Sequence, residues 1–148
     1  MIYKKEISDK IIGLAIEVHK NLGNGFLEKV YENAMMLELK MNNFKSINQV
    51  PIPVYYKENV VGDYYCDILV EDEIVLELKV AKTIDPIHEA QLLNYLKATR
   101  LKVGYILNFG LPDKLQFKCM VKWIKYISVF RCPRWQKNKN NSVPSVAN

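Results

Sequence analysis

The chain has 148 residues, of which 49% are hydrophobic and 25% are charged. That length predicts one domain, and that hydrophobic content excludes a disordered chain because it can form a core. No apolar run reaches the roughly 18 residues that a membrane-spanning helix needs. The first ten residues also lack the apolar stretch of a signal peptide. We therefore expect a cytoplasmic protein with no membrane partner.

The net charge of +5 is unevenly distributed along the chain. Residues 1–113 hold 13 Lys and Arg against 16 Asp and Glu, a net charge of −3. Residues 114–148 hold 8 Lys and Arg and no acid, a net charge of +8. A basic tail suits a polyanion such as nucleic acid, and the alternative is a solubilising tail without a specific partner.

Two helices are predicted before any strand. Residues 6–20 place apolar side chains at helical spacing, and residues 26–41 do the same. Gly23 and Gly25 separate the two patterns, because glycine adopts turn geometries that other residues avoid.

Strand character follows the second helix. Residues 50–56 predict an extended segment whose two prolines indicate a sheet edge or an irregular start. Residues 60–70 and 74–80 are rich in Val, Ile and Tyr, so each predicts a strand. The acidic residues 71–73 between them predict a tight turn.

The remaining segments predict a helix and then a buried strand. Asp85 is a good N-cap and Pro86 fits the first helical position, so we expect a helix from there to residue 99. Residues 102–109 show the pattern of a buried strand. Residues 117–130 mix aromatic and basic side chains and suit either a strand or a helix.

The order of these elements predicts the fold class. Two helices, three strands, a helix and a strand indicate an α/β fold, in which an antiparallel meander meets a parallel strand through a crossover helix. We place one domain at residues 1–130. Residues 131–148 have little periodicity and predict a basic, disordered tail.

The predicted hairpin places two acids opposite each other. If the turn is centred on Asp72, Asp67 faces Glu77 across the two strands. Side chains alternate between faces along a strand, so Lys79 shares the face of both acids. Opposed residues have Cβ atoms about 4.5–5.5 Å apart, so two carboxylates would repel each other unless a proton or a cation compensates them.

Two carboxylates at that spacing suit a hard cation such as Mg²⁺ or Mn²⁺. The ammonium of Lys79 would then orient an attacking water or stabilise negative charge that develops on a phosphate. The alternative is the solvent-facing side of an amphipathic hairpin, where charged residues are common.

Two predicted helices carry polar clusters that would complete such a site. Residues three and four apart lie on one side of a helix, and both clusters have this spacing. Each cluster alone is more typical of a solvated helix face, so its value lies in occurring together with the hairpin. The clusters are Glu28, Tyr31 and Glu32 on the second helix, and His88, Gln91 and Tyr95 on the later helix.

Residues 25–31 read Gly-x-x-Glu-x-x-Tyr. This segment resembles the bacterial GxxExxY family of the PD-(D/E)xK nuclease superfamily. The similarity continues through residues 50–56, Asp67, the Glu-Leu-Lys of residues 77–79, and residues 87–96 and 104–110. It covers roughly residues 5 to 112, with the motifs in the order and spacing of that family.

The resemblance implies a restriction-endonuclease-like αβββαβ core with an extra N-terminal helix. It also implies a Mg²⁺- or Mn²⁺-dependent nuclease acting on nucleic acid, with DNA as the expected substrate. The implied residue roles are catalytic for Lys79, Glu77, Asp67 and Glu28, metal-binding for Asp67, Glu77 and Glu28, and substrate-positioning for Gln91, Tyr95, Tyr31 and His88.

This sequence departs from the family pattern in one place. Relatives often carry a basic residue two positions before the strand acid, and here that position holds Tyr65. The departure puts a phosphate contact there in doubt but leaves the acids intact. The superfamily also includes inactive members, and a fold does not fix a function.

Two other classes of function remain open. One is a catalytically silent module that binds nucleic acid or a protein on the same fold. The other is an oligomerisation protein, since the tyrosines at positions 55, 56, 64 and 65 would suit an interface, although packing on the core is the expected role of such strand residues. A homodimer would suit paired cuts, and a protein partner would supply the specificity for which no reader motif is visible.

Overall fold

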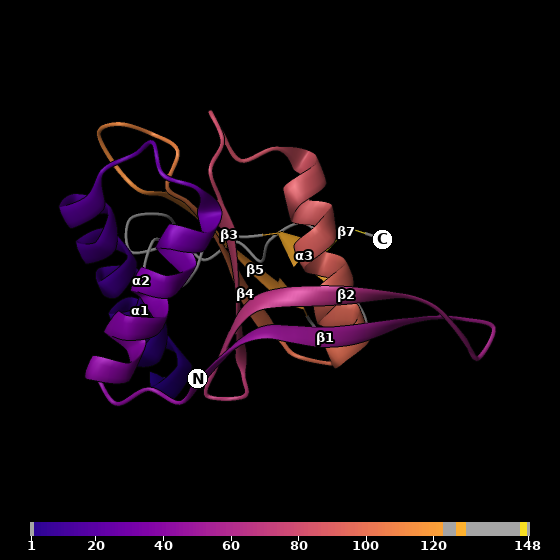
Figure 1. Ribbon diagram of the computed structural model, residues 1–148. Coiled ribbons are helices and arrows are strands. Elements are labelled where there is room, and N and C mark those ends of the chain that lie inside the picture. The colour runs from indigo at the N-terminus through magenta and orange to yellow at the C-terminus, as the bar shows by residue number, and fades with distance from the viewer. Residues whose placement is uncertain (1, 123–126, 130–145, 148) are drawn as a thin grey trace.

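The computed structural model describes residues 2–122, 127–129 and 146–147 (Figure 1). Its helices and strands follow the predicted order. The elements are α1 (Ile2–Leu22), α2 (Glu28–Met41), β1 (Ser46–Tyr56), β2 (Asn59–Val70), β3 (Ile74–Lys79), α3 (Pro86–Thr99), β4 (Val103–Asn108), β5 (Gln116–Lys122), β6 (Ile127–Val129) and β7 (Val146–Ala147).

The strands form one sheet in sequence order, from β1 at one edge to β7 at the other. Every neighbouring pair is antiparallel except β3 and β4, which are parallel and are joined through α3. The sequence α2-β1-β2-β3-α3-β4 is the predicted αβββαβ core, and α1 is the extra N-terminal helix. The predicted α/β, restriction-endonuclease-like fold is therefore confirmed.

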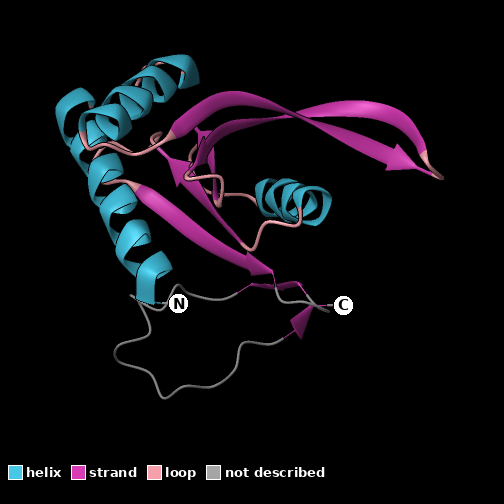
Figure 2. Cartoon of the chain, turned by 90° about the horizontal axis from the view of Figure 1, so that it is seen from below, coloured by secondary structure: helices cyan, strands magenta, loops and turns pink. Residues whose placement is uncertain are grey.

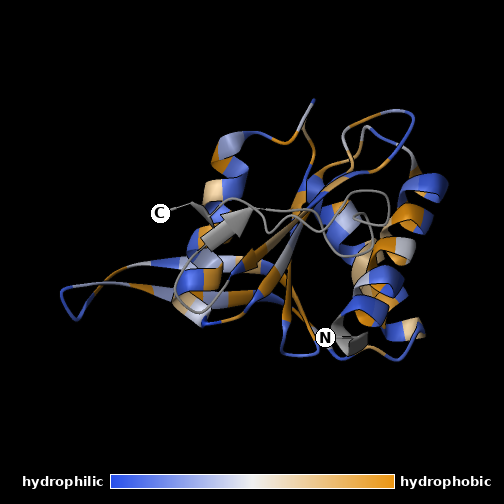
Figure 3. Ribbon diagram, turned by 180° about the vertical axis from the view of Figure 1, so that it is seen from behind, coloured by the Kyte–Doolittle hydropathy of each residue, from blue (hydrophilic) through white to orange (hydrophobic). Residues whose placement is uncertain are grey.

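Helices cover both faces of the sheet (Figure 1). α1 and α2 pack on one face, where Ile11, Tyr31, Leu76 and Phe109 belong to the larger of two buried clusters. α3 packs on the other face. Figure 3 shows apolar residues concentrated in the central strands between these helices. The smaller cluster lies under α3 and includes Ile52, Val75, Leu92, Leu96 and Ile106.

Several element boundaries differ from those predicted. α2 begins at Glu28 rather than at residue 26, and β1 begins at Ser46 rather than at residue 50. β1 forms the edge of the sheet, where prolines cost no ladder hydrogen bond, so the predicted edge position is confirmed. Residues 116–122 and 127–129 take the strand alternative, not the helical one.

The predicted tail lies mostly outside the described residues. Of residues 131–148, only Val146–Ala147 is described, and it pairs with β6. In the part of the chain that the structure describes, no helix is long and apolar enough to cross a membrane.

The distal part of the β1–β2 hairpin extends beyond the rest of the sheet as a two-stranded arm (Figure 2). We define this arm as residues 54–62. Tyr55 and Tyr56 are each 63% exposed there, and Val60 and Val61 are exposed as well. Tyr65, nearer the body, is also exposed. The expectation that the tyrosines of these strands pack on the core is therefore wrong for Tyr55, Tyr56 and Tyr65.

Candidate active site

The hairpin of β2 and β3 has the predicted register. Val70 pairs with Ile74, Leu69 with Val75, and Ile68 with Leu76. The next opposed positions in this register are Asp67 and Glu77. The turn is tight because Glu71 and Asp72 both adopt positive φ angles, of 52° and 55°.

Asp67 is half-buried, and its Oδ2 accepts a hydrogen bond from the backbone N–H of Leu78 at 2.8 Å. Burial raises the pKa of this carboxyl above its ordinary value, while the Leu78 N–H and the Lys79 ammonium act in the opposite direction. The negative charges of Glu28 and Glu32 raise the pKa further, so two of the acids of α2 influence Asp67.

Glu77 is more deeply buried than Asp67, and 5% of its surface is exposed. Burial, and then the neighbouring Asp67 carboxylate, raise its pKa to about 8, although the Lys79 ammonium lowers it in part. Its Oε1 atom is buried and has no hydrogen-bond partner in the structure. A buried acceptor without a hydrogen-bond partner costs free energy of folding, so this oxygen is the most unusual feature of the site.

Lys79 projects toward α3, where its Nζ atom lies 3.5 Å from Oε1 of Gln91. The start of α3 fixes the position of this helix. Asp85 caps it by accepting a hydrogen bond from the Ile87 N–H, and Nδ1 of His88 accepts one from the Asp85 N–H. His88 is therefore occupied in a capping box, and its ring orients α3.

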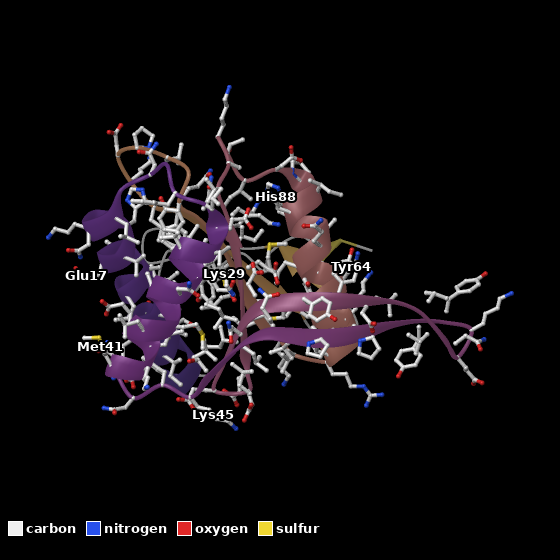
Figure 4. All side chains as sticks on the ribbon, viewed as in Figure 1. Glu17, Lys29, Met41, Lys45, Tyr64 and His88 are labelled. Atoms are coloured by element: carbon white, nitrogen blue, oxygen red, sulfur yellow. The ribbon has the colours of Figure 1, made fainter. Side chains whose placement is uncertain are left out.

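Tyr95 packs against β2 one turn further along α3. Its hydroxyl donates to the carbonyl of Tyr65, and its ring meets that of Tyr64 edge to face, with 5.0 Å between the ring centroids. Tyr64 is labelled in Figure 4. These contacts hold β2 close to α3 just before Asp67. Tyr95 thus braces the strand that carries the first acid.

Helix α2 carries the predicted polar cluster of Glu28, Tyr31 and Glu32. Glu28 is exposed in the first turn and affects the pKa of both strand acids through its charge. Glu32 is 5% exposed and accepts hydrogen bonds from Asn48, Gln49 and Lys29. Asn48 and Gln49 could not be identified from the sequence, because two amides ahead of the predicted strand of residues 50–56 fit no motif.

Tyr31 lies in the core and not on the surface of the site. It is fully buried, stacks on Phe109 at 4.6 Å, and donates a 2.6 Å hydrogen bond to the carbonyl of Gly23. Its hydroxyl also accepts from the Phe26 N–H. These contacts close the loop before α2, so the predicted contact between Tyr31 and a substrate has no support in its position.

The structure brings Asp67, Glu77, Lys79 and Gln91 together, and it leaves Glu28 at the margin. Among the described residues, no group of three His, Cys, Asp or Glu side chains is close enough to form a complete protein ligand set. Mg²⁺ does not require one, since it commonly binds one or two carboxylates and keeps waters or substrate phosphate as its other ligands. The unpartnered Glu77 oxygen and the raised pKa of both strand acids fit a cation at this position.

Comparison with known proteins adds one match. The sequence model of the family described as the PD-(D/E)XK nuclease superfamily matches residues 5–120. Searches of curated proteins and of solved structures returned no match. The matched range contains every residue of the site described above.

Proposed function

This chain belongs to the PD-(D/E)XK nuclease superfamily, and from that premise we propose that it hydrolyses phosphodiester bonds of nucleic acid with a divalent cation, Mg²⁺ or Mn²⁺. The observation that carries the proposal is the buried carboxyl of Glu77, which lacks a partner for Oε1 and lies beside Asp67. Asp67, Glu77 and Lys79 share one face of the hairpin near its open end, and all three match the superfamily pattern.

Each residue has a role that follows from its environment. Asp67 and Glu77 would hold the cation, with Glu28 close enough to add negative charge. A divalent cation bound there would supply Lewis-acid polarisation of the phosphate and would acidify the attacking water. Lys79, steadied by Gln91, would orient that water and stabilise the charge that develops on the phosphate.

The test is a cleavage assay with Mg²⁺ or Mn²⁺ on single-stranded, duplex and branched DNA and on RNA. We expect wild-type protein to cleave one substrate class, with duplex or branched DNA favoured. Glu77→Ala and Lys79→Ala should each lower kcat/KM by at least about a hundredfold. Lys20→Ala, which removes an exposed lysine of α1, should cleave like wild type. Equal activity of Glu77→Ala and wild type would contradict the proposal.

One observation favours a second candidate, a module that binds nucleic acid without cleaving it. Within the described ranges no third protein ligand joins Asp67 and Glu77. Such a module would bind through phosphates, so its affinity would fall with salt. It predicts that Glu77→Ala leaves the affinity for nucleic acid unchanged and that no metal supports cleavage by the wild-type protein.

A homodimer and a specificity-giving protein partner remain predictions. The exposed aromatic residues of the arm support a protein contact, because Tyr is enriched at interfaces. Sedimentation velocity at micromolar concentration tests the dimer, and a purely monomeric boundary would count against it.

A further inference from the structure

Glu32 is a buried carboxylate whose hydrogen-bonding capacity is used within the protein. It lies on the face of α2 toward the sheet and is 5% exposed. Its Oε1 accepts from the side-chain amides of Asn48 at 3.0 Å and Gln49 at 3.1 Å, and its Oε2 accepts from Lys29 at 3.3 Å. A buried carboxylate is stable in the protein only with such partners.

Near the site, β1 departs from regular strand geometry at Gln49, and Asn48 directly precedes this residue. Gln49 has a φ of 52°, a conformation that residues with side chains rarely adopt. β1 pairs Asn48 with Ile68 and Val50 with Cys66, and the position between them, Gln49 opposite Asp67, is left out of the ladder. The irregularity therefore faces the first acid of the site across the strands.

Asp67 is held from the other side as well. Its carboxylate accepts the Leu78 N–H of β3, which turns it toward Glu77. A regular pairing of Gln49 with Asp67 would tie the Asp67 backbone into the β1 ladder. The irregular geometry at Gln49, whose side-chain amide is bonded to Glu32 of α2, prevents this pairing. The position of Asp67 in β2 is then determined by its contact with β3.

We propose that Glu32 is a positioning residue: by binding the amides of Asn48 and Gln49 it holds Gln49 of β1 in its left-handed conformation opposite Asp67, and thereby fixes the Asp67 carboxylate beside Glu77. Glu32 itself does not hold the cation, because both of its oxygens already have partners, whereas Oε1 of Glu77 has none. The inference rests on the proposed cation site and adds a buried carboxylate of α2 to the groups that shape it.

The first experiment measures Mn²⁺ affinity by titration calorimetry on the full-length protein. Groups that orient metal ligands commonly change the affinity 10- to 100-fold when they are removed. We expect Glu32→Ala to weaken Mn²⁺ binding about tenfold or more. Glu32→Gln should bind within about threefold of wild type, because its amide oxygen still accepts from both neighbours. Glu38→Ala, which removes another α2 carboxylate, is the matched control and should not change the affinity.

A second readout does not depend on metal. Glu32→Ala should release Asp67 from Leu78, so hydrogen exchange at the Leu78 amide of the metal-free protein should accelerate about tenfold or more. Exchange in Glu32→Gln should match wild type. If wild type binds no Mn²⁺, the cation site fails, and this exchange measurement still decides whether Glu32 positions Asp67. Unchanged exchange in a folded Glu32→Ala protein would overturn the inference.

A pair of variants at Gln49 covers the case in which Glu32→Ala does not fold. Gln49 is exposed, so its substitution leaves the core intact. Gln49→Ala loses the bond to Glu32 but keeps the unfavourable backbone conformation, so Leu78 exchange should accelerate at least threefold. Glycine adopts a positive φ without a stabilising hydrogen bond, so the Leu78 amide of Gln49→Gly should exchange as in wild type. Wild-type exchange in Gln49→Ala would show that Glu32 does not act through this residue.

Discussion

Among single residues, Glu77 has the most perturbed environment of the described carboxyls. Its ordinary pKa of 4.5 rises to about 8, chiefly by burial and then by the charge of Asp67. The folded protein therefore keeps this proton over a pH range in which the unfolded chain has released it. Between these values the folded state binds more protons, so the free energy of unfolding falls as pH rises.

We predict that the metal-free protein loses stability between pH 4.5 and pH 8, by on the order of 3 kcal/mol from Glu77. The raised pKa of Asp67 acts in the same direction. Urea unfolding at several pH values in the presence of a chelator measures the slope. Glu77→Gln cannot ionise, so most of the slope should disappear in that variant. A free energy of unfolding that rises from pH 5 to pH 8 in both proteins would contradict the assignment.

How far single residues could be predicted from sequence depended on periodicity. The opposition of Asp67 and Glu77 follows from a strand period of two and a turn centred on Asp72, and the register confirms it. Tyr31 was misplaced because its motif position suggests the site, while the loop at Gly23 draws its hydroxyl into the core. Gln49 could not be predicted, since its positive φ and its bond to Glu32 occur where β1 meets α2, which no local sequence pattern specifies.

At the scale of elements, the loop from β3 to α3 decides where Lys79 and Gln91 lie. Asn108 is fully buried and exchanges two hydrogen bonds with Ala81, accepting its N–H and donating to its carbonyl. Gln116 accepts from the Asn108 amide and from the Ile84 N–H. These contacts fix the loop directly after Lys79.

Gly110 makes this loop contact possible, because a Cβ atom there would lie 2.3 Å from the backbone oxygen of Ala81. We predict that Gly110→Ala lowers the free energy of unfolding by about 2–3 kcal/mol through overpacking against backbone. Gly62→Ala is the matched control, since a Cβ there meets nothing within 4 Å, and it should change stability by less than about 0.5 kcal/mol. Chemical denaturation compares the two, and equal stability would show that the loop yields without cost.

The arm of residues 54–62 was predicted only as strand. Val and Tyr residues favour a strand whether it packs on the core or projects from it, so the sequence does not show that no third strand or helix covers the arm. Helix α3 was predicted in full because Asp85 and Pro86 carry a local capping signal. Local sequence signals thus predicted the helices and strands, whereas the burial of each element depends on tertiary packing.

We predict that the arm contributes little to the stability of the isolated chain. Replacing residues 55–61 by a two-residue Asn-Gly turn removes exposed side chains and keeps the pairing of Val54 with Gly62. The melting temperature should stay within about 3 °C of wild type, since few buried contacts are lost. A loss of more than about 10 °C would indicate that the arm packs on the body in solution.

In the whole molecule, the two helical layers meet the sheet so that carboxylates from β2 and β3 lie between α2 and α3. The metal-free fold maintains this pair at the cost of repulsion and of one unpartnered buried oxygen. A ligand that binds the folded state alone stabilises it by mass action, by about 2.7 kcal/mol at a hundred times its Kd. A cation at this site should therefore be visible in global unfolding, independently of any cleavage.

We predict that millimolar Mn²⁺ or Mg²⁺ raises the melting temperature of wild-type protein by several degrees at pH 8, where the carboxylates are most charged. Asp67→Asn should remove this response, because a carboxamide is a weaker ligand for a hard cation. The same variant, free of metal, should be at least as stable as wild type at pH 8, since it relieves the repulsion of Glu77. Differential scanning fluorimetry with and without a chelator measures both effects.

A wild-type melting temperature that does not change with divalent cations would contradict the proposed cation site. A metal-free Asp67→Asn protein that is strongly destabilised would instead assign Asp67 to the support of Leu78 and the strand.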